Sequence, residues 1–269
     1  MPIKETGNKV PLYIVHGDGL NVLNFGDLAR HVDEEQPVFG LQARGLDGIE
    51  QPMDDITEIA RHYINEILEH NPAGPYAIGG YSFGGYVAIE MRKQLEAMGK
   101  KVKMLAIFDT NAINAIYNKN LSEKIFKKIT RQVPKFFWFT RLFFRHPKTI
   151  TLYQLTYLQR QFYKMGLMKK PVSTGVYAQF DKINEKHLIA FKKYRLAPFD
   201  DRLYLFKSRI HIYFIDDQKY LGWAKYAKKG VLVYDVPGDH KTMFEPPNVK
   251  EFAGILQRAL DSVDSGNPE

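Results

Sequence analysis

The feature that most constrains the fold is a serine set between glycines where a strand pattern changes to a helix pattern. The apolar segment Pro75–Gly80 is typical of a short buried strand, and Tyr86–Met98 has the pattern of a helix. Between them Gly80–Gly84 reads GYSFG, a G-x-S-x-G motif. A turn this tight requires the glycines and lifts the hydroxyl of Ser82 above the sheet, near the N-terminus of the helix. We therefore expect Ser82 to be a nucleophile; the plainer alternative is a glycine-rich turn with an incidental serine.

The order of elements along the rest of the chain predicts the fold class. Residues 55–70 form the clearest helix, with one apolar stripe and a capping box of Asp55 and Glu58 at its start. Strands and helices alternate, which predicts a mostly parallel central sheet flanked by helices, and together with the serine motif an α/β-hydrolase fold. The further predicted strands are 11–16, 38–41, 103–108, 210–215 and 231–236, and the last predicted helix is 249–260.

The alternation lapses between about residues 113 and 200, where the sequence is helical, basic and aromatic. Tyr117–Lys170 contains 13 Lys or Arg, one acidic residue and 12 of the 36 aromatic residues of the chain. We expect this stretch to be a lid inserted over the carboxyl edge of the sheet, within a single domain that spans residues 1–269.

Composition excludes several kinds of chemistry. The chain has no cysteine, so disulfides, thiolate metal sites and cysteine nucleophiles are ruled out. No metal site or dinucleotide motif is evident, and no nucleic-acid module accompanies the basic segment. The N-terminus does not resemble a secretory signal, and no run of 18 uncharged apolar residues occurs. We expect a cytoplasmic protein with no metal, no nucleic-acid partner and no stable membrane insertion.

A serine nucleophile needs a histidine base and an acid that orients it. His240 lies in a loop after the last predicted strand, where this fold presents its base. Asp109 directly follows the strand after the serine helix, whereas Asp216 and Asp217 follow the next predicted strand. All three satisfy the chain order Ser, Asp, His, and composition does not separate them.

The oxyanion of the reaction intermediate needs two backbone N–H donors. We expect one from Phe83, the residue after the nucleophile. The other should come from the loop after the first strand, Gly17–Gly19, where we choose the N–H of Asp18.

The sequence resembles the thioesterase domains that end nonribosomal peptide and polyketide synthases. The resemblance covers about residues 10–262 and weakens in the lid. The segment Val38–Gly48, VFGLQARGLDG, is its most specific part. The other matching stretches are Gly74–Tyr76, Gly79–Gly85, Leu105–Thr110, and Val236–His240 with Met243.

The resemblance implies that Asp109 is the acid of the triad. It also implies that an acyl or peptidyl chain passes from the phosphopantetheine of a carrier protein to Ser82, and that water or an internal nucleophile then releases it. The protein would need no cofactor of its own. One departure from the family is His16–Gly19, where many relatives carry a proline or another small residue.

The lid suggests how a carrier-bound substrate would be held. We expect Phe136, Phe137, Trp138 and Phe139 to line an acyl channel. Basic residues on the outside, Lys124, Lys127, Lys128 and Arg131 among them, would meet an acidic carrier protein. The alternatives are peripheral membrane attachment through the same four aromatic residues and an ordinary amphipathic lid.

Two other functions compete with the thioesterase. A carboxylesterase or lipase would use the same three residues on oxygen esters, and the GLQARGLDG segment weighs against it. A non-catalytic scaffold on this fold would have little reason to keep the serine, acid and histidine together.

Overall fold

The computed structural model describes residues 1–266 apart from residues 19, 21, 113–129, 131, 169–173 and 212–213. Among the described residues, seven strands form one sheet in the order β1-β3-β2-β4-β5-β6-β7. Neighbouring strands are parallel except for β1, which is antiparallel to β3. The strands are β1 (Pro2–Lys4), β2 (Leu12–Val15), β3 (Val38–Leu41), β4 (Tyr76–Tyr81), β5 (Val102–Phe108), β6 (Leu203–Ile210) and β7 (Val231–Asp239).

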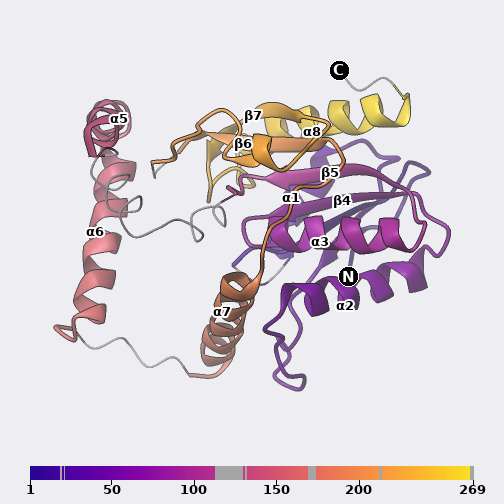
Figure 1. Cartoon of the computed structure of the whole chain (residues 1–269), viewed down its shortest axis with the longest axis horizontal. Coiled ribbons are helices and arrows are strands. Elements are labelled where there is room, and N and C mark those ends of the chain that lie inside the picture. The colour runs from indigo at the N-terminus through magenta and orange to yellow at the C-terminus, as the bar shows by residue number, and fades with distance from the viewer. Residues whose placement is uncertain are drawn as a thin grey trace.

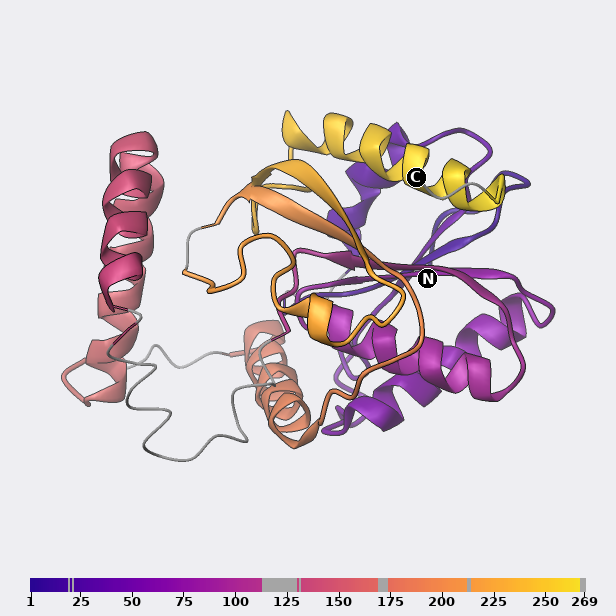
Figure 2. The same ribbon diagram turned by 45° about the horizontal axis from the view of Figure 1, so that its top comes forward.

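Helices cover both faces of this sheet, with α2 and α3 on one face and α1 and α8 on the other (Figures 1 and 2). The fully buried strand β2 shows why both faces need a cover. Tyr13 and Val15 belong to the apolar cluster of α2 and α3, whereas Leu12 and Ile14 belong to that of α1 and α8. The helices are α1 (Gly26–His31), α2 (Ile56–His70), α3 (Gly84–Ala97), α5 (Gln132–Arg145), α6 (Pro147–Lys164), α7 (Val176–Lys193) and α8 (Asn248–Asp264), with short 3₁₀ helices η1 (Leu23–Phe25) and η3 (Trp223–Lys225).

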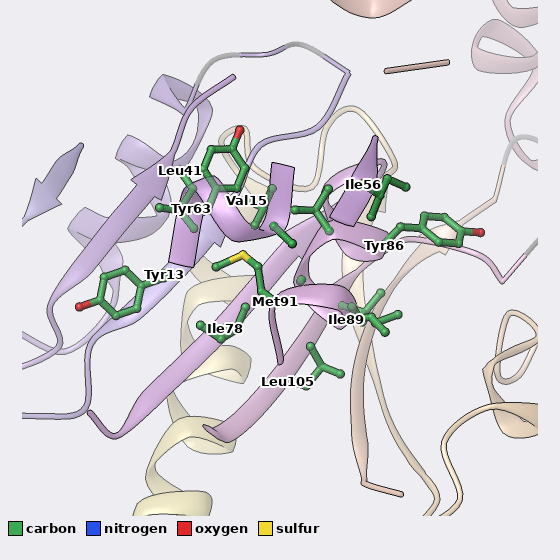
Figure 3. Close-up of a cluster of buried hydrophobic side chains, with 14 of the residues drawn as sticks. Tyr13, Val15, Leu41, Ile56, Tyr63, Ile78, Tyr86, Ile89, Met91 and Leu105 are labelled. Carbon is green, nitrogen blue, oxygen red and sulfur yellow. The ribbon is translucent and has the colours of Figure 1, made fainter. Parts of the chain in front are cut away.

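The cluster between the sheet and α3 fixes where the serine turn lies. Figure 3 shows Val15, Ile78 and Leu105 of three neighbouring strands with Ile89 and Met91 of α3. All five side chains are buried, and Met91 is fully so. Burial of such side chains typically contributes about 1.5–3 kcal/mol each, so α3 is firmly held against β4.

Most of the predicted elements are present within a few residues of their expected bounds. The capping residue of α2 is Asp55, whose carboxylate accepts hydrogen bonds from the N–H groups of Thr57 (2.7 Å) and Glu58 (3.3 Å). The short antiparallel strand β1 and helix α1 were not predicted by the sequence pattern.

The predicted strand at residues 210–215 is wrong, because β6 covers Leu203–Ile210 instead. A strand extends only as far as its neighbours do. Phe206 of β6 is paired with Phe108, the last residue of β5, and Ile210 is paired with Asp239, the last residue of β7. His211, Phe214 and Ile215 therefore lie outside the strand despite the apolar pattern of this segment.

The predicted lid corresponds, in its described part, to α5, α6 and α7 and contributes no strand to the sheet there. Helices α5 and α6 are adjacent to each other and stand to one side of the sheet (Figures 1 and 2). Helix α7 lies nearer, against α2 and α3, where its Phe191 contacts the ring of Tyr86. The predicted basic residues Lys124, Lys127, Lys128 and Arg131 lie outside the described residues.

The turn from β4 to α3 depends on close contacts between backbone atoms. A Cβ atom on Gly80 would lie 2.2 Å from the carbonyl oxygen of Gly84, and one on Gly84 would lie 2.4 Å from that of His16. Ser82, at the apex, has a φ of +54°, in the left-handed region that non-glycine residues seldom adopt. The two glycines therefore allow the turn that places Ser82 beyond the carboxyl end of β4.

We predict that Gly80→Ala destabilises the protein by about 1–3 kcal/mol or more, because the new methyl group would collide with the backbone of α3. The control is Gly254→Ala in α8, where the nearest atom to a new Cβ is the end of the Arg258 side chain at 3.6 Å. Because alanine favours helix, this control should be neutral or stabilising by up to about 1 kcal/mol. Urea unfolding followed by circular dichroism measures both, and equal stabilities of the two variants would contradict the steric account.

Candidate active site

The carboxyl edge of the sheet brings together three residues predicted from the sequence. Ser82 follows β4, Asp109 follows β5 and His240 follows β7. All three line one cavity of about 550 Å³. Nδ1 of His240 lies 2.8 Å from Oδ2 of Asp109. A carboxylate oxygen can only accept, so Nδ1 carries the proton and Nε2 is the basic nitrogen.

Asp109 is held in place by the neighbouring strand β6. Its N–H donates to the carbonyl of Phe206 at 2.8 Å. Its Oδ1 accepts hydrogen bonds from the backbone N–H of Ser208 at 2.8 Å and from the Ser208 hydroxyl at 3.0 Å. Ser208 is fully buried, and the φ of Asp109 is +50°. One carboxylate oxygen is thus bound by the strand, and the other is left to orient His240.

The same carboxylate has a second histidine beside it. Nε2 of His211 lies 3.5 Å from Oδ1 of Asp109. Burial by itself would raise the pKa of the Asp109 carboxyl, but the hydrogen bonds and charges of His211 and His240 outweigh it and hold the pKa well below 3.8. Asp109 is therefore ionised near neutral pH, as a group that orients a histidine must be.

His240 is also held by the residue that precedes the serine. The ring of Tyr81 stacks on that of His240, with centroids 4.8 Å apart and planes 30° apart. The Tyr81 hydroxyl donates a hydrogen bond to the backbone carbonyl of His240. The G-x-S-x-G turn and the histidine loop are thus linked directly, a contact that the sequence pattern did not reveal.

The wall of the cavity opposite the sheet comes from α7. The four residues of α7 that line the cavity are spaced i, i+3, i+4 and i+7, so they lie on one face of the helix. Asn184 and His187 make the first part of this face polar, and Leu188 and Phe191 make the rest apolar. The α7 wall therefore has a polar part and an apolar part within one cavity.

His187 of this wall and His16, which directly follows β2, belong to a stack of rings beside the serine turn. His187 stacks on Phe83, with centroids 4.5 Å apart, and on His16, with centroids 5.3 Å apart. Burial lowers the pKa of His16 to about 4 and that of His187 to about 3. Both rings are therefore neutral near pH 7 and anchor α7 to the serine turn as flat aromatic surfaces.

The two predicted oxyanion donors belong to residues of this cavity. Phe83 stands directly before the first residue of α3, and Asp18 lies in the loop after β2. Gly19 of that loop is outside the described residues. The assignment of the N–H groups of Asp18 and Phe83 to an oxyanion hole stays a prediction.

The four aromatic residues that were predicted to line an acyl channel belong to a different helix. Phe136, Phe137, Trp138 and Phe139 belong to α5 and are absent from the described lining of the cavity, which α7 provides instead. Phe136 and Phe137 are about two-thirds exposed. None of the four lines the cavity that contains Ser82, and their assignment to an acyl channel stays a prediction.

Of the alternative acids, Asp217 has hydrogen-bond partners in a turn. The carboxylate of Asp217 accepts hydrogen bonds from the N–H groups of Tyr220 (2.9 Å) and Gly222 (3.1 Å), and so caps a turn. Asp109 is the carboxylate that His240 contacts. Geometry thus favours Asp109 over Asp217 and its neighbour Asp216 as the partner of the histidine.

The described residues include neither a metal cluster nor a membrane-spanning helix. They contain no group of three or more His, Asp or Glu side chains placed to hold a metal ion. None of the helices described has both the length and the apolar character needed to cross a bilayer.

Comparison with known proteins supports the predicted resemblance. Residues 10–130 match the family model described as a thioesterase domain. The chain is 44% identical over 112 residues to malpibaldin synthetase of Mortierella alpina, covering 41% of this chain and 2% of that protein. It is 39% identical over 109 residues to atromentin synthetase invA5 of Paxillus involutus, covering 40% of this chain and 11% of that protein. The chain thus corresponds to a small part of these synthetases.

Among solved structures, the NocB thioesterase domain in covalent complex with a fluorophosphonate nocardicin G analogue is similar over nearly its whole length. The match has a TM-score of 0.66 at 21% identity and covers 94% of this chain and 96% of that one. The predicted α/β-hydrolase fold and the resemblance to thioesterase domains of nonribosomal peptide synthetases are confirmed.

We predict that Ser208→Ala slows the reaction of Ser82 with a fluorophosphonate probe by about tenfold, because Asp109 loses a charge-assisted hydrogen bond but keeps the Ser208 N–H. The rate of labelling, followed by intact mass, measures the effect. The matched control is Ser262→Ala in α8, which removes only a hydroxyl bonded to the carbonyl of Ala259 and should leave the rate unchanged. Equal rates for the two variants would show that the Ser208 hydroxyl does not position the acid.

Proposed function

We propose that this protein is a serine hydrolase that takes an acyl chain from a thioester onto Ser82 and then releases it. The observation that carries the proposal is the contact of Asp109 with His240 in the same cavity as Ser82. The match of residues 10–130 to a thioesterase domain supports thioesters as the substrate class.

The proposed mechanism assigns one role to each residue. Nε2 of His240 takes the proton of Ser82 as its Oγ attacks the thioester carbonyl carbon, and Asp109 stabilises the imidazolium that forms. The N–H groups of Phe83 and Asp18 stabilise the oxyanion. The intermediate collapses by breaking the C–S bond, and His240 returns the proton to the departing thiolate, so a thiol leaves and Ser82 carries an ester.

In the second half of the reaction, the acyl chain is released from Ser82. Water, or a hydroxyl or amine of the acyl chain itself, gives its proton to His240 and attacks the ester carbonyl. The C–O bond to Ser82 then breaks, and the serine regains its proton from His240. Water gives a free acid and an internal nucleophile gives a ring.

We further propose that the thiol is the phosphopantetheine of a carrier protein. The relatives are synthetases of which this chain matches 2% and 11%. On this proposal an attached or separate carrier would bring the substrate to such a part. On this proposal the protein uses no cofactor of its own, because the phosphopantetheine arrives with the substrate.

We predict that acyl-pantetheine thioesters transiently add the mass of the acyl group to the protein and are turned over. Ser82→Ala should form no adduct and lose at least about 10³-fold in turnover, because the attacking oxygen is gone. The control Ser265→Ala removes an exposed hydroxyl at the end of α8 and should behave as wild type.

Matched oxygen esters separate the competing functions in the same assay. Faster turnover of oxygen esters than of thioesters would indicate a carboxylesterase or lipase. Absence of an adduct with both classes, and also with acyl chains on a carrier protein, would refute an enzymatic role and favour a scaffold.

A further inference from the structure

A second cavity, of about 240 Å³, lies where α5 and the start of α6 approach the chain after β6. Its polar lining comes from both sides. Arg141, Arg145 and His146 belong to the lid. On the other side, Arg209 belongs to the end of β6, and His211 and Gln218 belong to the chain that follows it. The ring of Trp138 contacts that of Phe214 at a centroid distance of 6.0 Å and joins the two sides. The cavity is therefore a cationic pocket formed between the lid and the sheet.

Among the described residues, carboxylates balance only part of the positive charge of this pocket. None of the described lining residues carries a carboxylate. Arg209 forms an ion pair with Glu251 at 2.6 Å, and both side chains are about half exposed. Within the described part of the chain, no carboxylate pairs with Arg141 or Arg145. Residues 132–164, which form α5 and α6, contain six Lys or Arg and no acidic residue.

Arginines that face one pocket without counter-charges repel each other, and an anion between them removes that repulsion. The guanidinium group also matches a phosphate oxygen pair with two parallel hydrogen bonds, which makes arginine the preferred residue for phosphate recognition. A volume of about 240 Å³ exceeds that of one phosphate group and leaves room for a linked chain.

The pocket lies next to the catalytic acid. His211 lines it and places Nε2 3.5 Å from Oδ1 of Asp109, while Asp109 also lines the cavity that contains Ser82. The two cavities therefore lie on either side of the Asp109–His211 contact. A ligand that occupies both would have its anionic group at the arginines and its reacting group at the serine.

We propose that this pocket binds a phosphate ester, and that the group it holds during turnover is the phosphodiester of the substrate's phosphopantetheine arm. The assignment to the arm rests on the proposed function, whereas the phosphate site itself does not. Arg141 and Arg145 bind the phosphate oxygens, and Arg209 completes the positive environment while remaining tied to Glu251.

The experiment compares two substrates that differ by one phosphate, acyl-pantetheine and acyl-phosphopantetheine with the same acyl group. We expect the phosphorylated substrate to have a KM about tenfold lower or more, since two charge-assisted contacts are added. In the double variant Arg141→Gln/Arg145→Gln the two KM values should become equal.

The control Lys135→Gln/Lys148→Gln removes the same number of charges from α5 and α6, at positions that are exposed like Arg141 and Arg145 but do not line the pocket. It should keep the KM difference between the substrates. If it reduces the difference as much as the arginine variant does, a general electrostatic field and not a site is responsible, and the proposal is overturned.

A binding measurement separates this inference from the proposed function. Calorimetry with phosphopantetheine, pantetheine and inorganic phosphate should show that wild type binds phosphopantetheine more tightly than pantetheine, and that the arginine variant does not. This result without turnover of either thioester would refute the proposed function and leave the phosphate site standing. Equal KM values in wild type with normal turnover would overturn the site and leave the function standing.

Inorganic phosphate distinguishes the two sources of the ligand. If the arm occupies the pocket, phosphate should compete with acyl-phosphopantetheine and not with acyl-pantetheine. If phosphate binds and the arginine variant abolishes that binding, but phosphate does not compete with acyl-phosphopantetheine, the pocket takes a free phosphate ester and the assignment to the arm is wrong.

Discussion

The close approach of backbone atoms at Gly80 and Gly84 is the constraint on which the rest of the site depends. A Cβ atom on Gly80 would lie 2.2 Å from a neighbouring carbonyl oxygen, and one on Gly84 would lie 2.4 Å from another, so neither position has room for a Cβ atom. This contact brings α3 directly against the ends of β2 and β4 and forces Ser82 into a left-handed conformation at the apex. Packing of α3 in the buried cluster with the sheet supplies the stabilisation that holds the turn.

The acid and the base are placed by the strands on the other side of β4. Asp109 directly follows β5, and its carboxylate reaches across to β6, where Ser208 provides two donors to one oxygen. That arrangement leaves the second oxygen for His240. Tyr81 then ties the histidine loop to the serine turn, so the three predicted catalytic residues are connected through backbone elements and not only through their own side chains.

The sequence predicted the parts of this arrangement that are local. The GYSFG motif and its flanking patterns indicated the turn, and the order of strands indicated a parallel sheet with His240 and three candidate acids at its carboxyl edge. The family resemblance then chose Asp109 among these acids. The sequence could not reveal Ser208, because a serine within a strand has no local signature of the carboxylate it binds. It also misplaced the strand at 210–215, since where a strand ends depends on its neighbours, and it did not indicate that α7 lines the cavity of Ser82.

The most direct test of the account is a crystal structure of the protein after reaction with a fluorophosphonate. We predict a covalent bond between phosphorus and Oγ of Ser82, with Nε2 of His240 near that oxygen and the phosphonyl oxygen within about 3 Å of the N–H groups of Phe83 and Asp18. A label on another residue would contradict the assignment of the nucleophile. A label on Ser82 whose phosphonyl oxygen points away from both N–H groups would contradict the proposed oxyanion hole.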